Sequence, residues 1–168
     1  MNIDIRAALE SDVPRLEALP FSAGLRSKHR ERLARQVAGQ VKYILAVDEG
    51  WIIGHLLLKW NCPEHPDLRR LIPSCAEIED FVVTPDQRGQ GVGSALLEFA
   101  AHACRERGDT RLGLAVGKEN PSAYGLYTRR GFVLVPESDH RVTWLARDTT
   151  GHEVEEHEDC VYLIKELV

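Results

Sequence analysis

Three glycines at alternate positions, Gly89, Gly91 and Gly93, follow an apolar segment and precede an amphipathic one. A helix that begins here would present unpaired backbone N–H groups and the positive end of its dipole. Glycine also lets an anion approach the main chain closely, so the chemistry that this pattern favours is the binding of phosphate oxygens. We therefore expect a phosphorylated ligand at residues 88–94.

Spacing separates three ways in which glycines bind phosphate. A nucleotide P-loop has a lysine between its last glycine and a Ser or Thr, whereas Ser94 follows Gly93 directly. A dinucleotide-binding turn needs a third glycine where Ser94 stands and an acidic residue after the next strand, whereas Asp109 precedes that strand. The third arrangement, R/Q-x-x-G-x-G/A, is matched by residues 88–93, RGQGVG.

A second pattern lies at residues 120–132, NPSAYGLYTRRGF. Asn120 can cap a helix that begins at Pro121, Tyr127 shares an inner face with the apolar residues before it, and Gly131 can end the helix. The two segments together resemble the GCN5-related N-acetyltransferase (GNAT) family, whose second signature is N-x-x-A-x-x-L-Y-x-x-x-G-F. The resemblance is specific over residues 76–132 and only architectural on either side.

The resemblance implies acetyl-CoA as co-substrate. Its pyrophosphate would be held by the residues of the glycine motif, which are Arg88, Gly89, Gln90, Gly91, Val92, Gly93 and Ser94. Main-chain amides of Phe81, Val82 and Val83 would meet the thioester and the pantetheine arm. Asn120 would contact the pantetheine or a water that handles the proton. Lys118, Arg129 and Arg130 could meet a further phosphate.

Acetyl transfer to an amine needs a base, because a solvated primary amine has a pKa near ~10.4. Glu77 and Glu79 share one face of an expected strand, whereas Asp80 points the other way unless a bulge changes the register. In the family that this chain resembles, a carboxylate on this strand often serves as the base, so both glutamates are candidates. Tyr127 occupies the family's acid position and would protonate the departing thiolate, because a phenol with a pKa near ~10 stays protonated at pH 7.

We expect the acceptor to be a primary amine of a small molecule or a lysine-type side chain. Three segments would wall its site, residues 20–30, 61–74 and 137–158, and the glutamates would favour a cation. Some family members that act on peptide α-amines have a glutamate where this chain has Ala115, which disfavours that class. Transfer would be direct, since Cys75 has no recognisable histidine partner for a ping-pong route.

The alternative function is a non-catalytic acyl-CoA-binding sensor or a module that pairs with a catalytic partner. The retention of Tyr127 beside intact glycines argues against it. A homodimer is left open.

Composition narrows the class of protein. The 168 residues fit one domain spanning 1–168, and a net charge of −5 from 26 acids and 21 bases disfavours a nucleic-acid partner. No apolar run approaches the ~20 residues of a membrane span, and Asp4, Arg6 and Glu10 do not fit a signal peptide. We therefore expect a cytoplasmic protein without a membrane partner.

Cysteines and histidines give no framework for a metal or for disulfides. The histidines lack ligand spacing, and we expect no metal. We expect free thiols at the four widely separated cysteines, Cys62, Cys75, Cys104 and Cys160.

Apolar periodicity predicts an α/β (α+β) chain of strands and flanking helices. The resemblance implies the GNAT fold, a mixed central sheet of about six to seven strands with a splayed parallel pair at the cofactor site. Strands are expected at residues 2–8, 41–47, 51–60, 75–83, 111–116, 132–135 and 159–167. Helices are expected after a cap at Ser11, at 25–40, from 92 to the stop at Gly108, and from 121 to Gly131.

Three of these elements carry a more detailed expectation. The helix at 25–40 should turn Leu33, Val37 and Ala38 inward. Residues 61–74 contain three prolines and should form a loop, and residues 141–151 could add a hairpin to the end of the sheet.

Overall fold

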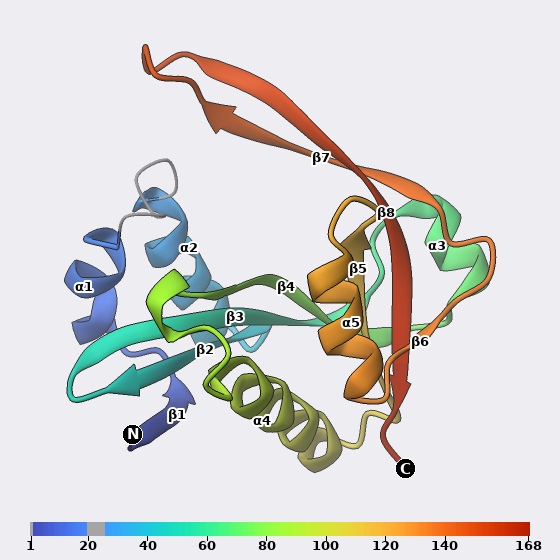
Figure 1. The fold of residues 1–168 in the computed structure, drawn as a ribbon, viewed down its shortest axis with the longest axis horizontal. Helices are drawn as coiled ribbons and strands as arrows, with labels where there is room; N and C mark the ends of the chain where they lie inside the picture. The colour runs from blue at the N-terminus through green and yellow to red at the C-terminus, as the bar shows by residue number, and fades with distance from the viewer. Residues whose placement is uncertain (1, 20–25) are drawn as a thin grey trace.

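The computed structural model describes residues 2–19 and 26–168 (Figure 1). In the described residues, eight strands form one sheet in the order β1-β2-β3-β4-β5-β8-β6, and β7 pairs with β8. The strands are β1 (Ile3–Ala7), β2 (Val41–Asp48), β3 (Trp51–Cys62), β4 (Cys75–Val83), β5 (Arg111–Gly117), β6 (Val133–Leu134), β7 (His140–Arg147) and β8 (Glu153–Glu166). The α-helices are α1 (Val13–Glu17), α2 (Arg26–Val37), α3 (Pro66–Leu71), α4 (Val92–Arg107) and α5 (Pro121–Arg129).

Strands β4 and β5 are the only parallel neighbours in the described sheet. They pair at three positions, from Ala76 opposite Leu112 to Ile78 opposite Leu114, and the pairing then stops although both strands continue. Beyond this point each strand has backbone groups on the facing edge that the other does not satisfy. The expected mixed sheet with a splayed parallel pair is therefore confirmed.

A β-bulge interrupts β4 just after the point where pairing with β5 stops. Glu79 lies opposite Leu57 on β3 and Val82 lies opposite His55, so two residues of β4 face Leu56 alone. The first of the two, Asp80, has φ of +51°, in the left-handed region. An extra residue on one strand shifts the register of all that follow. The alternation expected along residues 75–83 is thus broken at Asp80.

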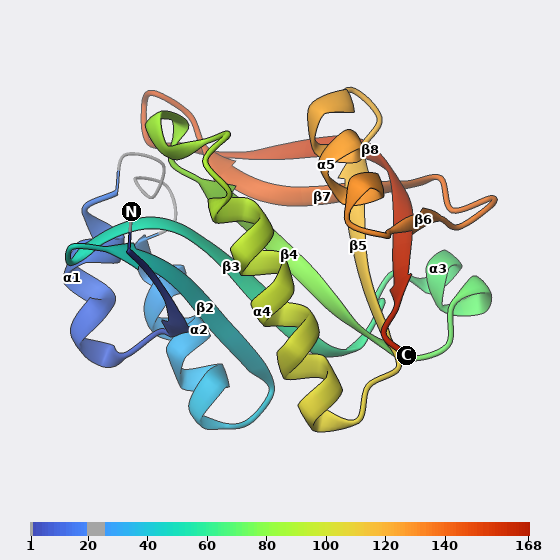
Figure 2. The same cartoon turned by 60° about the horizontal axis from the view of Figure 1, so that its bottom comes forward.

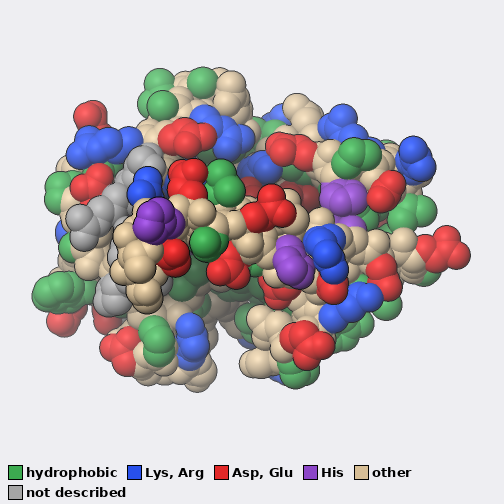
Figure 3. Space-filling view, turned by 90° about the horizontal axis from the view of Figure 1, so that it is seen from above, with side chains coloured by type: hydrophobic (Ala, Val, Ile, Leu, Met, Phe, Trp, Pro, Cys, Tyr) green, Lys and Arg blue, Asp and Glu red, His purple; other side chains and the backbone are tan. Residues whose placement is uncertain are grey.

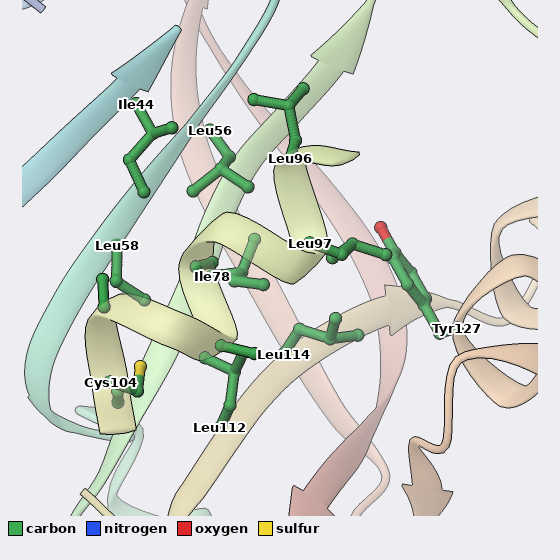
Figure 4. Close-up of a cluster of buried hydrophobic side chains, with 14 of the residues drawn as sticks. Ile44, Leu56, Leu58, Ile78, Leu96, Leu97, Cys104, Leu112, Leu114 and Tyr127 are labelled. Carbon is green, nitrogen blue, oxygen red and sulfur yellow. The ribbon is translucent and has the colours of Figure 1, made fainter. Parts of the chain in front are cut away.

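Two layers of helices cover opposite faces of the sheet (Figure 2). Alternate residues of β2 point to opposite faces, so Ile44 packs in the cluster under α4 while Tyr43 and Leu45 pack in the cluster that includes Leu16 of α1. Figure 4 shows the first cluster, in which Leu96 and Leu97 of α4 meet the side chains of β3, β4 and β5. This cluster holds the start of α4 against the splayed strands.

Most expected elements are confirmed. Helix α4 ends at Gly108, which has φ of +92°, and Glu49 and Gly50 form the turn between β2 and β3 with positive φ. The hairpin at the end of the sheet exists, because β7 pairs with the first half of a long β8 from Arg147 opposite Glu153 to His140 opposite Cys160. In Figure 1 this hairpin extends across the top of the molecule.

The expected inner face of the second helix is wrong. Residue 25 lies outside the described residues, but Val37 is 89% exposed and Ala38 is also exposed. From residue 28 to the end of α2, the buried side chains are instead polar, His29 and Arg32, because the sheet beneath presents polar partners. Leu33 does pack against the second cluster as expected.

Two other expectations need correction. Ser11 is not the helix cap: it lies in the 3-10 turn η1 (Glu10–Asp12), and Asp12 accepts a 2.7 Å hydrogen bond from the N–H of Leu9. Residues 61–74 are not a plain loop, because α3 begins at Pro66. Proline at the first position of a helix loses no hydrogen bond, and His65 accepts from the N–H of Asp67 at 3.3 Å.

Candidate active site

The glycine segment forms an open turn that leads into α4. Gly89 and Gly91 have φ of +73° and +88°, conformations that L side chains rarely adopt. The first three N–H groups of α4, at Val92, Gly93 and Ser94, find no acceptor among the described residues. Three free donors and the positive end of a 16-residue helix therefore meet at this point.

A cavity of about 990 Å³ opens from these donors along the gap between β4 and α5. Arg88 borders it, and its Nε donates a 3.0 Å hydrogen bond to the carbonyl of Val83. The predicted cofactor residues that line it are Phe81, Val82, Val83, Arg88, Gly89, Gly91, Gly93, Ser94, Asn120 and Tyr127. The cavity thus brings together the two sequence motifs and the end of β4.

Two predicted cofactor residues do not line this cavity. The side chain of Val92 is buried in the core, and Gln90 instead donates from Nε2 to the carbonyl of Asp86 at 3.1 Å. Of the three cations named from the sequence, Arg129 and Arg130 line the cavity. Lys118 is drawn away, since its Nζ lies 2.7 Å from Asp139 Oδ2.

Strand β4 directs alternate amides into the gap. The N–H of Thr84 donates to Ile53 on β3 at 2.9 Å, and Val82 lies opposite His55 on the same strand. Because backbone groups alternate sides along a strand, the N–H groups of Phe81 and Val83 face away from β3, toward the splayed side. These two amides are therefore donors without a strand partner.

A second cavity, of about 550 Å³, lies on the other side of the gap between β4 and β5. Its walls come from β4 and β5, from the segment around α3, and from the base of the β7–β8 hairpin. Four residues line both cavities: Phe81, Asn120, Ala123 and Tyr127. The two spaces therefore meet at the ring of Tyr127.

Tyr127 is held firmly at this junction. Only 8% of the residue is exposed, and its ring centroid lies 6.1 Å from that of Phe81 and 5.9 Å from that of Phe132. Figure 4 shows Tyr127 at the edge of the core cluster. Burial raises the pKa of its hydroxyl to about 12, so the group is a protonated donor at neutral pH.

Glu77 extends from β4 into the second cavity, where Tyr162 of β8 holds it. The Tyr162 hydroxyl donates a 2.8 Å hydrogen bond to Glu77 Oε2. Gly113 of the intervening strand makes this contact possible, because a Cβ there would overlap the Tyr162 hydroxyl. Burial raises the pKa of Glu77, although the Tyr162 hydrogen bond and the charge of Lys59 oppose that rise.

Glu79 has a different environment although it lines the same cavity. It is exposed, and its Oε2 lies 3.3 Å from Nζ of Lys59, which also contacts Glu64 at 3.1 Å. Glu77 is half-buried and hydrogen-bonded to Tyr162, whereas Glu79 is exposed and ion-paired with Lys59. The structure thus separates the two glutamates that the sequence treated as equal candidates.

Asn120 sits where the two cavities meet and caps α5. Its Oδ1 accepts a 3.2 Å hydrogen bond from the N–H of Ala123. The amide nitrogen of the same side chain remains available as a donor toward the cavities.

Comparison with known proteins identifies the family. A profile of the Acetyltransferase (GNAT) family matches residues 10–132, which is more than half of the chain. The chain belongs to the GNAT family. The resemblance seen in the two sequence motifs is therefore confirmed.

Several curated proteins match parts of this GNAT chain. The aminoalkylphosphonate N-acetyltransferase of Salmonella typhimurium is 30% identical over 92 residues, 55% of this chain and 56% of that protein. The streptothricin acetyltransferase of Streptomyces lavendulae is 46% identical over 55 residues, 33% of this chain and 29% of that protein. The matched segments span 25% to 56% of the length of these curated relatives.

Solved structures share the GNAT fold over nearly the whole chain. The PaiA N-acetyltransferase from Thermoplasma acidophilum, crystallised in complex with coenzyme A, superimposes with a TM-score of 0.69 at 16% identity. The superposition covers 99% of each chain. The two chains therefore share the same fold.

Sequence reasoning missed several residues that line the second cavity of this GNAT chain. Tyr162, His140 and Glu158 come from β7 and β8, and no motif marks them. The carboxylate of Glu158 rests against the Cα position of Gly117, where a Cβ would overlap it. The one available signal was the length of the 137–158 segment, which pointed to the hairpin but to none of its side chains.

Among the described residues of the GNAT chain, the cysteines are buried and the potential metal ligands lie apart. Within residues 2–19 and 26–168, no three His, Cys, Asp or Glu side chains gather so that they could hold a metal ion. All four cysteines are free and buried, which confirms that expectation. Burial raises the pKa of Cys75 to about 11, so it is a thiol at neutral pH.

The surface gives two further observations. In Figure 3, which looks down on the hairpin side, Lys and Arg side chains are scattered among Asp, Glu and His, and a notch opens at the lower edge of the molecule. None of the described helices combines the length and apolar composition that a membrane-spanning helix requires.

Proposed function

We propose that this protein is an acetyl-CoA-dependent N-acetyltransferase that moves an acetyl group to a primary amine by direct transfer in a ternary complex. One observation carries the proposal: Tyr127 lies where a cavity with phosphate-binding character meets a cavity with carboxylates. A reaction between a phosphorylated donor and an amine needs these two spaces to meet at an acid. Membership of the GNAT family supports the same reaction.

The first cavity fits coenzyme A. Gly89 and Gly91 have open space where a side chain would stand, so diphosphate oxygens can reach the free N–H groups at the start of α4. Arg129 and Arg130 border the same cavity and can pair with a further phosphate. When bound, acetyl-CoA supplies an activated acetyl thioester. The chain in turn binds the phosphates and directs the thioester end toward Tyr127.

The amides of Phe81 and Val83 are suited to stabilise negative charge on the acyl oxygen. They face the splayed side of β4 and lack a strand partner, so no hydrogen bond must be broken before they act. Donors that are already aimed at a developing charge contribute the largest single share of catalysis in many enzymes.

Proton transfer would involve Glu77 and Tyr127. Glu77 is half-buried and has a raised pKa, which brings a carboxylate closer to the range of an effective base. It would take the amine proton directly or through a water, with Glu79 as the second candidate. Tyr127 is protonated at neutral pH, because burial raises the pKa of its hydroxyl to about 12, and it would give that proton to the thiolate as the C–S bond breaks.

The acceptor is proposed to be a cationic amine of a small molecule or a lysine-type side chain. The carboxylates that line the second cavity are Glu64, Glu77, Glu79, Asp80 and Glu158. Its two cations are already paired, Lys59 with Glu64 and Glu79, and Arg141 with Asp159. Carboxylates in a confined space attract an ammonium group and can deprotonate it. Two relatives, by name, act on aminoalkylphosphonate and thialysine, which are amines.

Release of free coenzyme A thiol tests the function against the alternative of a non-catalytic acyl-CoA sensor. Purified protein and acetyl-CoA would be incubated with polyamines, aminoglycosides, amino acids and peptides, with amine-free and protein-free controls. We expect thiol release with at least one cationic amine and none without it. Tight acetyl-CoA binding with no release for any amine would favour the sensor.

A further inference from the structure

The bulge in β4 places a non-glycine residue in an unfavourable conformation. Asp80 has φ of +51°, which costs an L residue about 1–2 kcal/mol relative to an ordinary strand conformation. Asp tolerates this region better than most side chains, but only glycine adopts it freely. Some other interaction must therefore hold residue 80 in place.

Arg32 supplies that interaction from helix α2, which covers the face of the sheet opposite α4. Arg32 of α2 is 8% exposed, and its Nη1 lies 2.6 Å from Asp80 Oδ2. The guanidinium is itself fixed, because it stacks over the ring of Tyr43 at 5.3 Å from the centroid. A buried, stacked arginine has lost its freedom in advance, so the ion pair with Asp80 costs little further entropy.

The ion pair also explains the polar inner face of α2. A buried arginine is costly unless its charge is paired, and Asp80 is the carboxylate that it meets. Burial acts to raise the pKa of Asp80, but the charges of His55 and Arg32 outweigh it and hold that pKa below its usual value. Asp80 is therefore ionised at neutral pH.

The bulge decides which amides reach the gap between β4 and β5. Pairing with β5 ends at Ile78, two residues before Asp80. Removing the extra residue from the register would move each following residue to the opposite side of the strand. Val82 would then face the gap, and Phe81, whose ring contacts Tyr127, would leave it.

We infer that the Arg32–Asp80 ion pair holds the bulge that directs the amides of Phe81 and Val83 at the acyl group, which makes Arg32 a positioning residue for transfer. This inference rests on the proposed function, since it gives those amides a role in the reaction. Arg32 does not line either cavity, so its effect passes through the backbone of residues 80–83.

Two double variants separate backbone conformation from charge. Arg32→Met/Asp80→Gly and Arg32→Met/Asp80→Ala both remove the complete ion pair, so neither leaves an unpaired buried charge. They differ in one methyl group at residue 80, and glycine accepts a positive φ that alanine resists. The Gly variant should keep the bulge without the ion pair, whereas the Ala variant should relax toward a regular strand.

We expect kcat of the Ala double variant to be at least tenfold below that of the Gly double variant at saturating acetyl-CoA. We expect the melting temperature of the Ala variant to be equal or higher, because alanine is the better strand residue once the bulge is lost. If the ion pair only stabilised the fold, activity would follow the melting temperature, and the Ala variant would be at least as active as the Gly variant. Equal kcat in the two variants, both near that of wild type, would overturn the inference.

Backbone carbon chemical shifts at residue 80 give a readout that needs no turnover. The Gly variant should retain a left-handed shift and the Ala variant should show an extended one. A left-handed shift in the Ala variant would show that the ion pair is not what holds the bulge, and would overturn the inference. If wild type transfers acetyl to no amine, the proposed function fails, yet the shifts still decide whether the ion pair holds the bulge.

Discussion

The hydroxyl of Tyr162 in β8 reaches across β5 and donates a 2.8 Å hydrogen bond to the carboxylate of Glu77 in β4. Gly113 of β5 leaves room for this contact, and the Tyr162 ring is completely buried. A hydrogen bond to an ionised carboxylate stabilises the charged form and lowers its pKa. The half-buried position of Glu77 acts in the opposite direction, so its proton affinity is a balance of the two.

The substitution Tyr162→Phe removes the hydrogen bond that lowers the pKa of Glu77. The pKa of Glu77 should rise further, because the Tyr162 hydrogen bond favours the ionised carboxylate and its loss leaves burial less opposed. A base acts in its deprotonated form, so the acid limb of the kcat/KM profile should move to higher pH. Tyr124→Phe on α5 is the control, and identical profiles for wild type and Tyr162→Phe would contradict the role of Tyr162.

Glu77→Gln and Glu79→Gln test the base itself. We expect Glu77→Gln to lower kcat/KM by about 10²-fold at neutral pH, the usual contribution of a general base, with partial recovery as rising pH deprotonates the amine. Glu79→Gln should have a smaller effect, since Glu79 is exposed and paired with Lys59. Unchanged pH–rate profiles in both variants would show that neither glutamate is the general base and that another group, for example a water chain, takes the proton.

Tyr127→Phe tests proton delivery to the thiolate. The ring contacts with Phe81 and Phe132 survive this change, so the melting temperature and acetyl-CoA affinity should stay near those of wild type. The kcat value should fall by about 10²-fold or more. Because burial raises the pKa of Tyr127 to about 12, wild-type kcat should not decline as the pH rises to about 10. A folded Phe variant with full turnover would remove Tyr127 from the mechanism.

Gly91→Asp tests the phosphate cradle. An acidic side chain there would repel phosphate at the start of α4, so the rise in melting temperature with acetyl-CoA should disappear. Gly39→Asp is a matched control, because Gly39 has φ of +76° and open space around it but lies after α2, outside both cavities. A Gly91→Asp variant that binds acetyl-CoA like the Gly39→Asp control would show that the cradle is wrongly placed.

Local sequence signals were enough for most of the fold and for the cofactor cradle. The glycines, the cap at Asn120 and the apolar period of α4 act over a few neighbouring residues, so their structure can be inferred from spacing. Pro66 was misread because a proline that begins a helix and a proline in a loop look alike without a view of the next turn.

Contacts between distant residues could not be inferred in this way. The Arg32–Asp80 ion pair and the Tyr162–Glu77 hydrogen bond join residues far apart in the chain, and each depends on the register of the sheet. Val37 was expected on the buried face of α2 because it is apolar. Arg32 lies on that face instead, because it pairs there with the carboxylate of Asp80. The bulge at Asp80 likewise has no signature in the sequence, since an aspartate in a strand more often marks an edge.

Mass spectrometry of the reaction products tests the central claim most directly. The protein would be incubated with acetyl-CoA and the cationic amine that releases most thiol, and both the amine and the intact protein would be weighed. The account predicts one acetyl group on a primary amine nitrogen of the acceptor, none on the protein, and loss of product with Tyr127→Phe. An acetyl group resting on Cys75, or an acceptor that never gains one, would contradict it.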